Sequence, residues 1–144
     1  MEGFLGTRAP FLSDLSLLLT IVFGAAAAIG AINGLRRRIS KHCPVMATGA
    51  FLNWIPVLVV MIPKWLGVAT GSAEVAAGLP TVAALGHGVL GGITQLLMTY
   101  TVTRMYWLDD LPPDRPIWLM RTTGVLWGLT IFGGVLVYLN LYVR

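Results

Sequence analysis

The sequence contains 144 residues, of which 56% are hydrophobic and 11% are charged, and its formal net charge is +4 at pH 7. Soluble domains carry about 25% charged residues, so this chain cannot cover a globular surface in water and is expected to lie in a bilayer. The positive charge does not indicate nucleic-acid binding, because the cations stand at the ends of apolar runs. The single cysteine excludes an internal disulfide bond.

Four apolar segments reach the length of about 20 residues that a membrane-spanning helix needs. They cover residues 15–35, 43–63, about 80–103 and about 122–143. Ser13 or Asp14 is expected to cap the first helix, and Pro44 suits the first turn of the second. Pro56 lies inside the second segment, where it removes a backbone hydrogen bond and is expected to kink the helix. The connections are too short for a second domain, so residues 1–144 are predicted to form one all-α domain, a bundle of four transmembrane helices.

The distribution of lysine and arginine predicts the orientation of this bundle. The loops after the first and third segments hold seven cations: Arg36, Arg37, Arg38, Lys41, Arg104, Arg115 and Arg121. The other side holds three: Arg8, Lys64 and Arg144. Since cytoplasmic loops carry the excess of positive charge, both termini are expected on the extracytoplasmic side. The first segment is interpreted as a retained helix, because Glu2 and Pro10 stand where a signal peptide would carry basic residues.

Small residues recur four positions apart in three of the segments and predict close helix packing. Such spacing lets two helices approach closely in a bilayer, where apolar side chains gain little over lipid by touching each other. The faces serve either the bundle itself or docking to another subunit. The residues are Gly30 and Gly34, then Ala84, Gly88 and Gly92, then Gly124 and Gly128.

Polar groups inside the apolar segments are few. His87 lies about seven residues into the third segment, and Asn53 and Gln95 are expected to form hydrogen bonds across helices. Aspartate, glutamate and lysine are absent from the middle of the segments, which weakens an interpretation as a proton-driven transporter. A small transporter that works as an oligomer stays open as an alternative.

The stretch RRRISKHCPVM, at residues 36–46, carries three potential soft-metal ligands. His42 and Met46 stand four residues apart and share a helix face, with Cys43 beside them. Imidazole, thiolate and thioether together suit Cu(I). The alternative is structural, since methionine fills gaps in apolar packing and His42 can face phosphate headgroups.

Haem binding is the other ligand hypothesis for His42 and His87. The two histidines lie near opposite ends of the bundle, roughly 20 Å apart at 1.5 Å per residue, so they cannot share one haem. A histidine–methionine pair is conceivable, with Met61 or Met98 as the partner of His87. The sequence contains no nucleophile–base set, so the chain is not expected to be an enzyme and no cofactor is expected, with haem or copper as the open alternative.

Several stretches of the chain resemble a family of small four-helix bacterial membrane proteins, the domain of unknown function 420 family. They are GFLGTRAPFLSDLSLLL, KHCPVM, LGHGVL and PIWLMRTTGVLWGLTIFGGVLVYLNLY. Members of that family include a maturation factor of haem–copper terminal oxidases. The family's two recurring histidines correspond to His42 and His87. Many members carry a further histidine before the last helix, where this chain has PPDRPIWLMR, so a ligand role that needs this third histidine is not implied.

The sequence and the resemblance together predict an integral protein of the bacterial cytoplasmic membrane. Its expected function is that of a non-catalytic accessory subunit or assembly factor of a larger complex, respiratory or otherwise metal-containing. Its expected partners are the lipid bilayer and other membrane protein subunits, with no nucleic acid. The first alternative is a haem- or copper-binding carrier that uses His42, Met46 and His87, and the second is the small oligomeric transporter.

Overall fold

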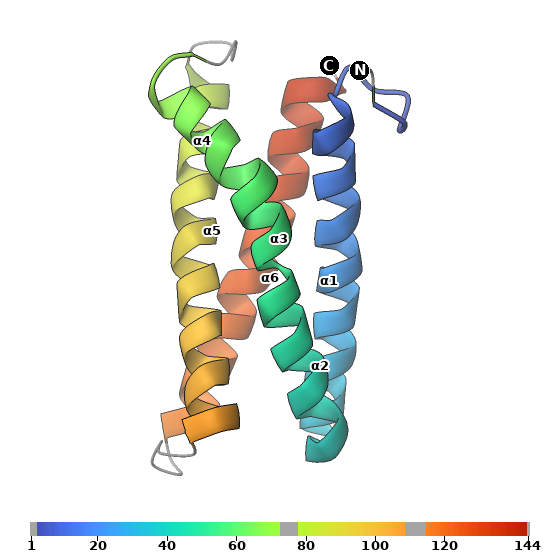
Figure 1. Cartoon of the computed structure of the whole chain (residues 1–144), viewed down its shortest axis with the longest axis vertical. Helices are drawn as coiled ribbons and strands as arrows, with labels where there is room; N and C mark the ends of the chain where they lie inside the picture. The colour runs from blue at the N-terminus through green and yellow to red at the C-terminus, as the bar shows by residue number, and fades with distance from the viewer. Residues whose placement is uncertain (1–2, 73–77, 109–114, 144) are drawn as a thin grey trace.

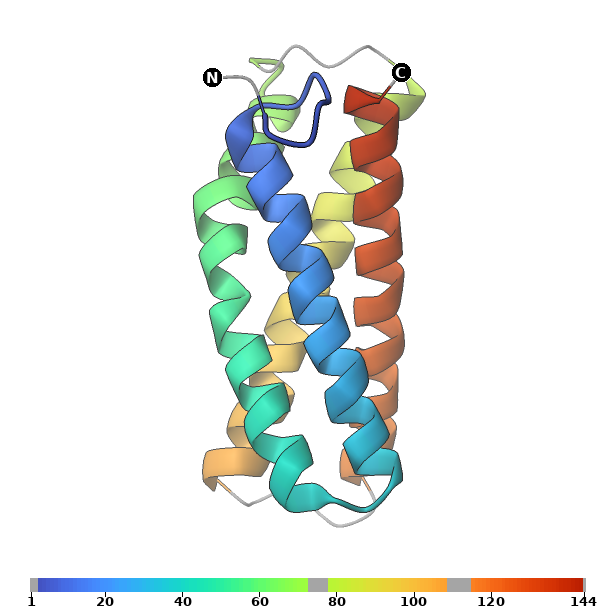
Figure 2. The same cartoon turned by 90° about the vertical axis from the view of Figure 1, so that its right-hand side faces the viewer.

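The computed structural model describes residues 3–72, 78–108 and 115–143, and the regular elements in these ranges are helices. The helices run side by side along one long axis, and both chain ends lie at the same end of the bundle (Figures 1 and 2). Four helical segments are long and apolar enough to cross a membrane: Phe11–Leu35, Ile39–Ala69, Pro80–Thr103 and Ile117–Tyr142. The prediction of four long apolar helices is therefore confirmed, although the second extends to Ala69 and the fourth begins at Ile117, outside the predicted bounds. The chain has the features of a multi-pass membrane protein.

Helix α1 (Phe11–Leu35) begins earlier than the sequence predicted, and the predicted cap is wrong. Its N-cap residue is Pro10, and no side chain caps it. Asp14 lies within the helix and is 0% exposed. Its carboxylate forms contacts with distant parts of the chain, so it does not serve the first turn of its own helix.

The turn between α1 and α2 (Ile39–Leu52) is tight. The Arg38 N–H donates to the Asn33 carbonyl at 2.8 Å and the Arg37 N–H to the Gly34 carbonyl at 3.0 Å, the pattern of a Schellman C-cap. This early closure lets α2 start at Ile39, ahead of the expected Cys43. Pro44 consequently lies inside α2, so its predicted place in the first turn is also wrong.

The second span is irregular around Pro56, as expected. After α2 the chain forms α3 (Trp54–Pro56), the π-helix η1 (Val57–Met61) and α4 (Ile62–Ala69). Proline has no N–H to donate to the preceding turn, and π-helical segments commonly arise where the regular hydrogen-bond ladder is interrupted. The structure shows an interruption of the α-helix directly after Pro56, where the sequence predicted a kink.

The other two spans are α5 (Leu79–Thr103), which continues into the π-helix η2 (Arg104–Leu108), and α6 (Arg115–Tyr142). Helix α5 packs mainly against α6, and α1 packs mainly against α2. The largest cluster of buried apolar side chains in the described residues consists of Ala50, Met98 and Trp127, with partly buried neighbours such as Phe23 and Ile131. Large apolar side chains cover the outside, among them Leu58, Val82, Leu96, Val125 and Phe132. This distribution suits a bundle solvated by lipid tails.

Candidate functional site

A buried carboxylate ties three segments together at the end of the bundle that carries the termini. Asp14 of α1 accepts hydrogen bonds from the Leu5 N–H at 2.8 Å and from the Tyr138 hydroxyl of α6. The Thr7 hydroxyl lies 3.4 Å from the same carboxylate and 2.8 Å from the Tyr138 hydroxyl. A Cβ on Gly3 would collide with Asp14, so the N-terminal segment is packed tightly over it. Residues 3–9 are thereby held across the end of the bundle.

Lys64 extends this network to the second span. Its ammonium group donates to the Ser13 hydroxyl and, at 3.2 Å, to the Tyr142 hydroxyl. The same ammonium lies 5.4 Å from the centroid of the Tyr142 ring, within the range of a cation–π interaction. The Arg8 N–H donates to the Tyr142 carbonyl at 3.3 Å. Helices α1, α4 and α6 therefore meet the N-terminal segment in one polar network.

A second polar cluster joins α2 to α5 within the bundle. The Asn53 amide donates to Gln95 Oε1 at 2.8 Å, and the Gln95 amide donates to the Ala50 carbonyl at 2.9 Å. Both side chains are buried, at 9% and 3% exposure. Close by, the Trp54 indole N–H donates to the Thr99 hydroxyl at 3.0 Å. The predicted cross-helix hydrogen bonds of Asn53 and Gln95 are confirmed, and they hold the irregular second span against α5.

Threonines line the contact between α5 and α6. The hydroxyls of Thr94 and Thr130 lie 3.2 Å apart, and those of Thr101 and Thr123 lie 3.5 Å apart. Each hydroxyl also lies within hydrogen-bonding distance of a carbonyl one turn back in its own helix. These hydroxyl groups are satisfied inside the bundle, so the α5–α6 seam is a structural contact.

His87 lies further along the same seam, toward the termini. A Cβ on Gly134 would stand 3.0 Å from His87 Cε1, and one on Gly133 would stand 3.4 Å from Nδ1, so the two glycines make room for the imidazole ring. His87 Nδ1 is buried and has no hydrogen-bond partner within the described part of the chain. Met98, one proposed partner of His87, lies instead in the core against Ala50 and Trp127.

His42 and Met46 pack against Gly34 and Gly30 of α1, which are two of the predicted packing positions. His42 Nδ1 lies 2.8 Å from the Gly30 carbonyl, an acceptor for that nitrogen. A Cβ on Gly34 would stand 2.9 Å from His42 Nδ1, and one on Gly30 would stand 2.7 Å from Met46 Sδ. Cys43 is half-buried beside them, with a free thiol. The imidazole and the thioether both pack α2 onto α1.

The predicted glycine face of α5 meets the second span at one position. The Trp65 ring of α4 lies directly on Gly88, and its N–H donates to the Leu85 carbonyl at 3.1 Å. Ala84, on the same face, is half-buried. Gly88 therefore permits a close contact between α4 and α5 that a side chain would block.

At three other predicted packing positions, no atom of the described residues lies where a side chain would begin. A Cβ on Gly92, Gly124 or Gly128 would meet no heavy atom within 4 Å. Gly124 and Gly128 are exposed and stand one turn apart on α6. Their face is thus not used for packing within this chain, and it offers a shallow surface toward the bilayer.

Among the described residues, His, Cys, Asp and Glu side chains do not gather in groups of three or more that could hold a metal ion. Residues 109–114, which include three aspartates of the sequence, lie outside the described residues. Comparison of the chain with protein-family models, with curated protein sequences and with solved structures gives no match.

The sequence prediction missed the network around Asp14. Asp14 was interpreted as a local cap, and its partner Tyr138 lies 124 residues away in the chain. A signal was present, because an ionisable residue at the start of an apolar span is costly unless it is paired. Lys64 near the end of the second span offered the same signal, and both residues belong to the network.

Proposed function

We propose that this chain is a non-catalytic accessory subunit or assembly factor that docks within the bilayer onto a larger membrane protein complex. The observation that carries the proposal is the outward glycine face of α6, where Gly124 and Gly128 have open space around them. Small residues at this spacing allow the backbone of another helix to approach closely, which is how many transmembrane helices associate. Other glycines of this chain, such as Gly30 and Gly88, are covered by side chains of the same bundle. Gly124 and Gly128 are not, so they are available to a partner helix.

The polar groups within the spans also favour a structural role over a transport pathway. Asp14 is enclosed by the N-terminal segment, and Asn53 and Gln95 satisfy each other. A conducting pathway would need polar groups that face a water-filled cavity. The resemblance described above favours a respiratory or other metalloenzyme complex as the partner.

The proposal includes an orientation in the bacterial cytoplasmic membrane with both termini outside. Its support is the arrangement of the loops, since the turn after α1 and the end of α5 lie at one end of the bundle and the termini at the other (Figure 1). The arginine-rich loops therefore share one side, as the positive-inside rule requires of cytoplasmic loops.

The docking proposal is tested by recovering the tagged protein from native membranes in mild detergent, with partners identified and counted by mass spectrometry. Wild type is expected to bring down one membrane complex in a fixed ratio. The double variant Gly124→Leu/Gly128→Leu is expected to lose most of that complex, because two leucines prevent close approach of a partner helix.

The matched control is Gly86→Leu, since Gly86 also has open space around it but lies on α5 among large exposed side chains such as Val82 and Val89. This variant is expected to recover the complex as wild type does. Equal recovery by the α6 double variant, or a wild type that is always recovered alone, would count against docking through this face.

A second candidate function, a haem or metal carrier, is favoured by one observation: the buried Nδ1 of His87 without a partner in the described residues. The Nδ1 of His42 faces the Gly30 carbonyl, which leaves Nε2 as the ring nitrogen of His42 for a ligand. For the accessory role we expect purified protein to be colourless and free of stoichiometric metal, with the same spectrum for His87→Ala. A Soret band or bound copper that His87→Ala removes, while helix content is kept, would replace the accessory role with the carrier.

A further inference from the structure

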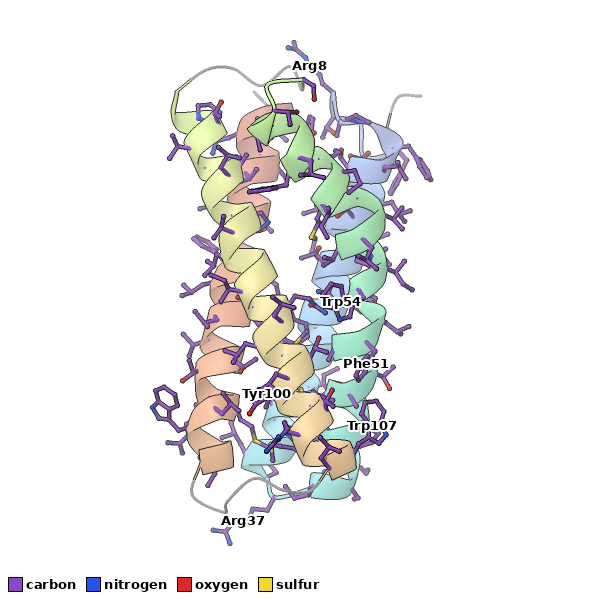
Figure 3. The ribbon with its side chains drawn as sticks, turned by 60° about the vertical axis from the view of Figure 1, so that its left-hand side comes forward. Arg8, Arg37, Phe51, Trp54, Tyr100 and Trp107 are labelled. Carbon is purple, nitrogen blue, oxygen red and sulfur yellow. The ribbon has the colours of Figure 1, made fainter. Side chains whose placement is uncertain are left out.

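The end of the bundle opposite the termini carries a dense positive surface, the basic turn, formed by Arg36, Arg37, Arg38 and Lys41. All four side chains are exposed. Figure 3 shows Arg37 extending away from the bundle at the end opposite Arg8. The turn directly follows the apolar helix Phe11–Leu35, so its guanidinium groups are expected at the depth of lipid headgroups. Clusters of this kind attract anionic lipids, and each cation near the surface contributes to the binding.

The backbone of the basic turn is not the one that arginine prefers. Arg37 has φ = 57°, and it is the one non-glycine residue in the described ranges with a positive φ. It occupies the position after the helix end that usually belongs to glycine, because a Cβ is unfavourable in this conformation. Glycine or asparagine would close the same turn with less strain, so backbone stability does not account for an arginine at this position.

Apolar side chains flank the cations on both sides. Leu35 is 83% exposed and Ile39 is 55% exposed, and these two residues border the three arginines in the chain. A site with cations at headgroup depth and exposed aliphatic side chains next to them fits a molecule that is anionic at one end and aliphatic at the other. Arginine in particular binds phosphate oxygens in a bidentate manner.

We propose that the basic turn is a binding site for the phosphate headgroup of an anionic phospholipid, whose acyl chains lie along Leu35 and Ile39. This site is separate from the docking face of α6 and does not depend on the proposed function. The excess of positive charge in cytoplasmic loops does not explain this site, because that rule depends on the number of cations and does not require one at Arg37, where the backbone is strained. Replacing Arg37 alone leaves six of the seven cations in the loops after the first and third spans, so the protein is expected to keep its orientation in the membrane.

The test counts lipids bound to the purified full-length protein in non-ionic detergent by native mass spectrometry. Phosphatidylglycerol and phosphatidylcholine of the same acyl chains are added in competition. Wild type is expected to retain phosphatidylglycerol preferentially. Arg37→Gly is expected to reduce that preference about fivefold, as the loss of one surface cation implies, while its thermal stability in detergent stays equal or rises, because glycine suits the backbone.

Two matched variants separate charge at this site from charge in general. Arg37→Lys keeps the cation but loses the bidentate geometry, so its preference is expected to lie between those of wild type and Arg37→Gly. Arg8→Gln removes one exposed cation from the opposite end and is expected to leave the preference unchanged. Equal retention of the two lipids by wild type, or an equal loss in Arg8→Gln and Arg37→Gly, would overturn the proposal. Displacement of the lipid by glycerol phosphate at equal concentration would overturn it too, by showing a site for a free phosphate ester.

Discussion

Replacing Asp14 with alanine is expected to lower the free energy of unfolding by about 3 kcal/mol, because it leaves at least two polar groups without their acceptor. The Leu5 N–H and the Tyr138 hydroxyl both donate to this carboxylate, which is itself 0% exposed. The measurement is unfolding in mixed detergent micelles, followed by circular dichroism. Tyr138→Phe removes the hydrogen bond of the phenol to this charged group and its contact with the Thr7 hydroxyl, and is expected to lower the same free energy by about 2 kcal/mol.

Thr20→Ala is the matched control for this prediction. Thr20 lies in the same helix, and its hydroxyl donates only to the Ser16 carbonyl within that helix. Its removal is expected to change the free energy of unfolding by less than about 0.5 kcal/mol. If Asp14→Ala were no more destabilising than Thr20→Ala, the network at the bundle end would contribute little to stability, and its role would have to be sought elsewhere.

Gln95→Leu is the second substitution with a large expected effect, a loss of about 2 kcal/mol of unfolding free energy. It removes the acceptor of the Asn53 amide and the donor to the Ala50 carbonyl, both in a region without water to replace them. The two groups belong to the segment next to the π-helix, so the contact of the second span with α5 is expected to loosen. A double-mutant cycle with Asn53→Ala, measured in the same unfolding experiment, gives the coupling between the two side chains.

The matched control is Asn140→Leu, which makes a similar amide-to-leucine change at an exposed position of α6. The Asn140 amide donates only to the Leu136 carbonyl of its own helix. This variant is expected to stay within about 0.5 kcal/mol of wild type. Strict additivity of the Asn53 and Gln95 substitutions would show that the observed hydrogen bond between them carries no coupling energy.

Much of the fold could be predicted from apolar length alone. The requirement for a span of about 20 apolar residues is independent of sequence detail, so four spans were found from four apolar runs. The boundaries were less accurate, because they depend on contacts that no local pattern specifies. Helix α2 starts before Pro44 because the preceding turn closes through hydrogen bonds to Asn33 and Gly34. The irregular segment near Pro56 was predictable, since the missing N–H is a property of the residue itself.

The candidate sites were less predictable, and the glycines show why. A spacing of four residues identifies a small-residue face but not which way that face points. Gly30 turned out to face Met46, while Gly128 faces open space. The same limit applies to His42, whose Nδ1 partner is a backbone carbonyl of α1 twelve residues away in the chain. Hydrogen bonds to backbone atoms of another helix leave no mark in the sequence.

The bond between Asp14 and Tyr138 has a consequence for the order in which the protein assembles during synthesis. Asp14 belongs to α1 and Tyr138 to α6, which is synthesised after the other three spans described here, so the carboxylate has no phenol to bind until translation of α6 is nearly complete. The first three spans can insert and pair before that moment, but the N-terminal segment can settle over the bundle only afterwards. A chain that stops short of α6 lacks the phenol partner of this acid, and a carboxylate at the start of a span is costly when its partner is missing.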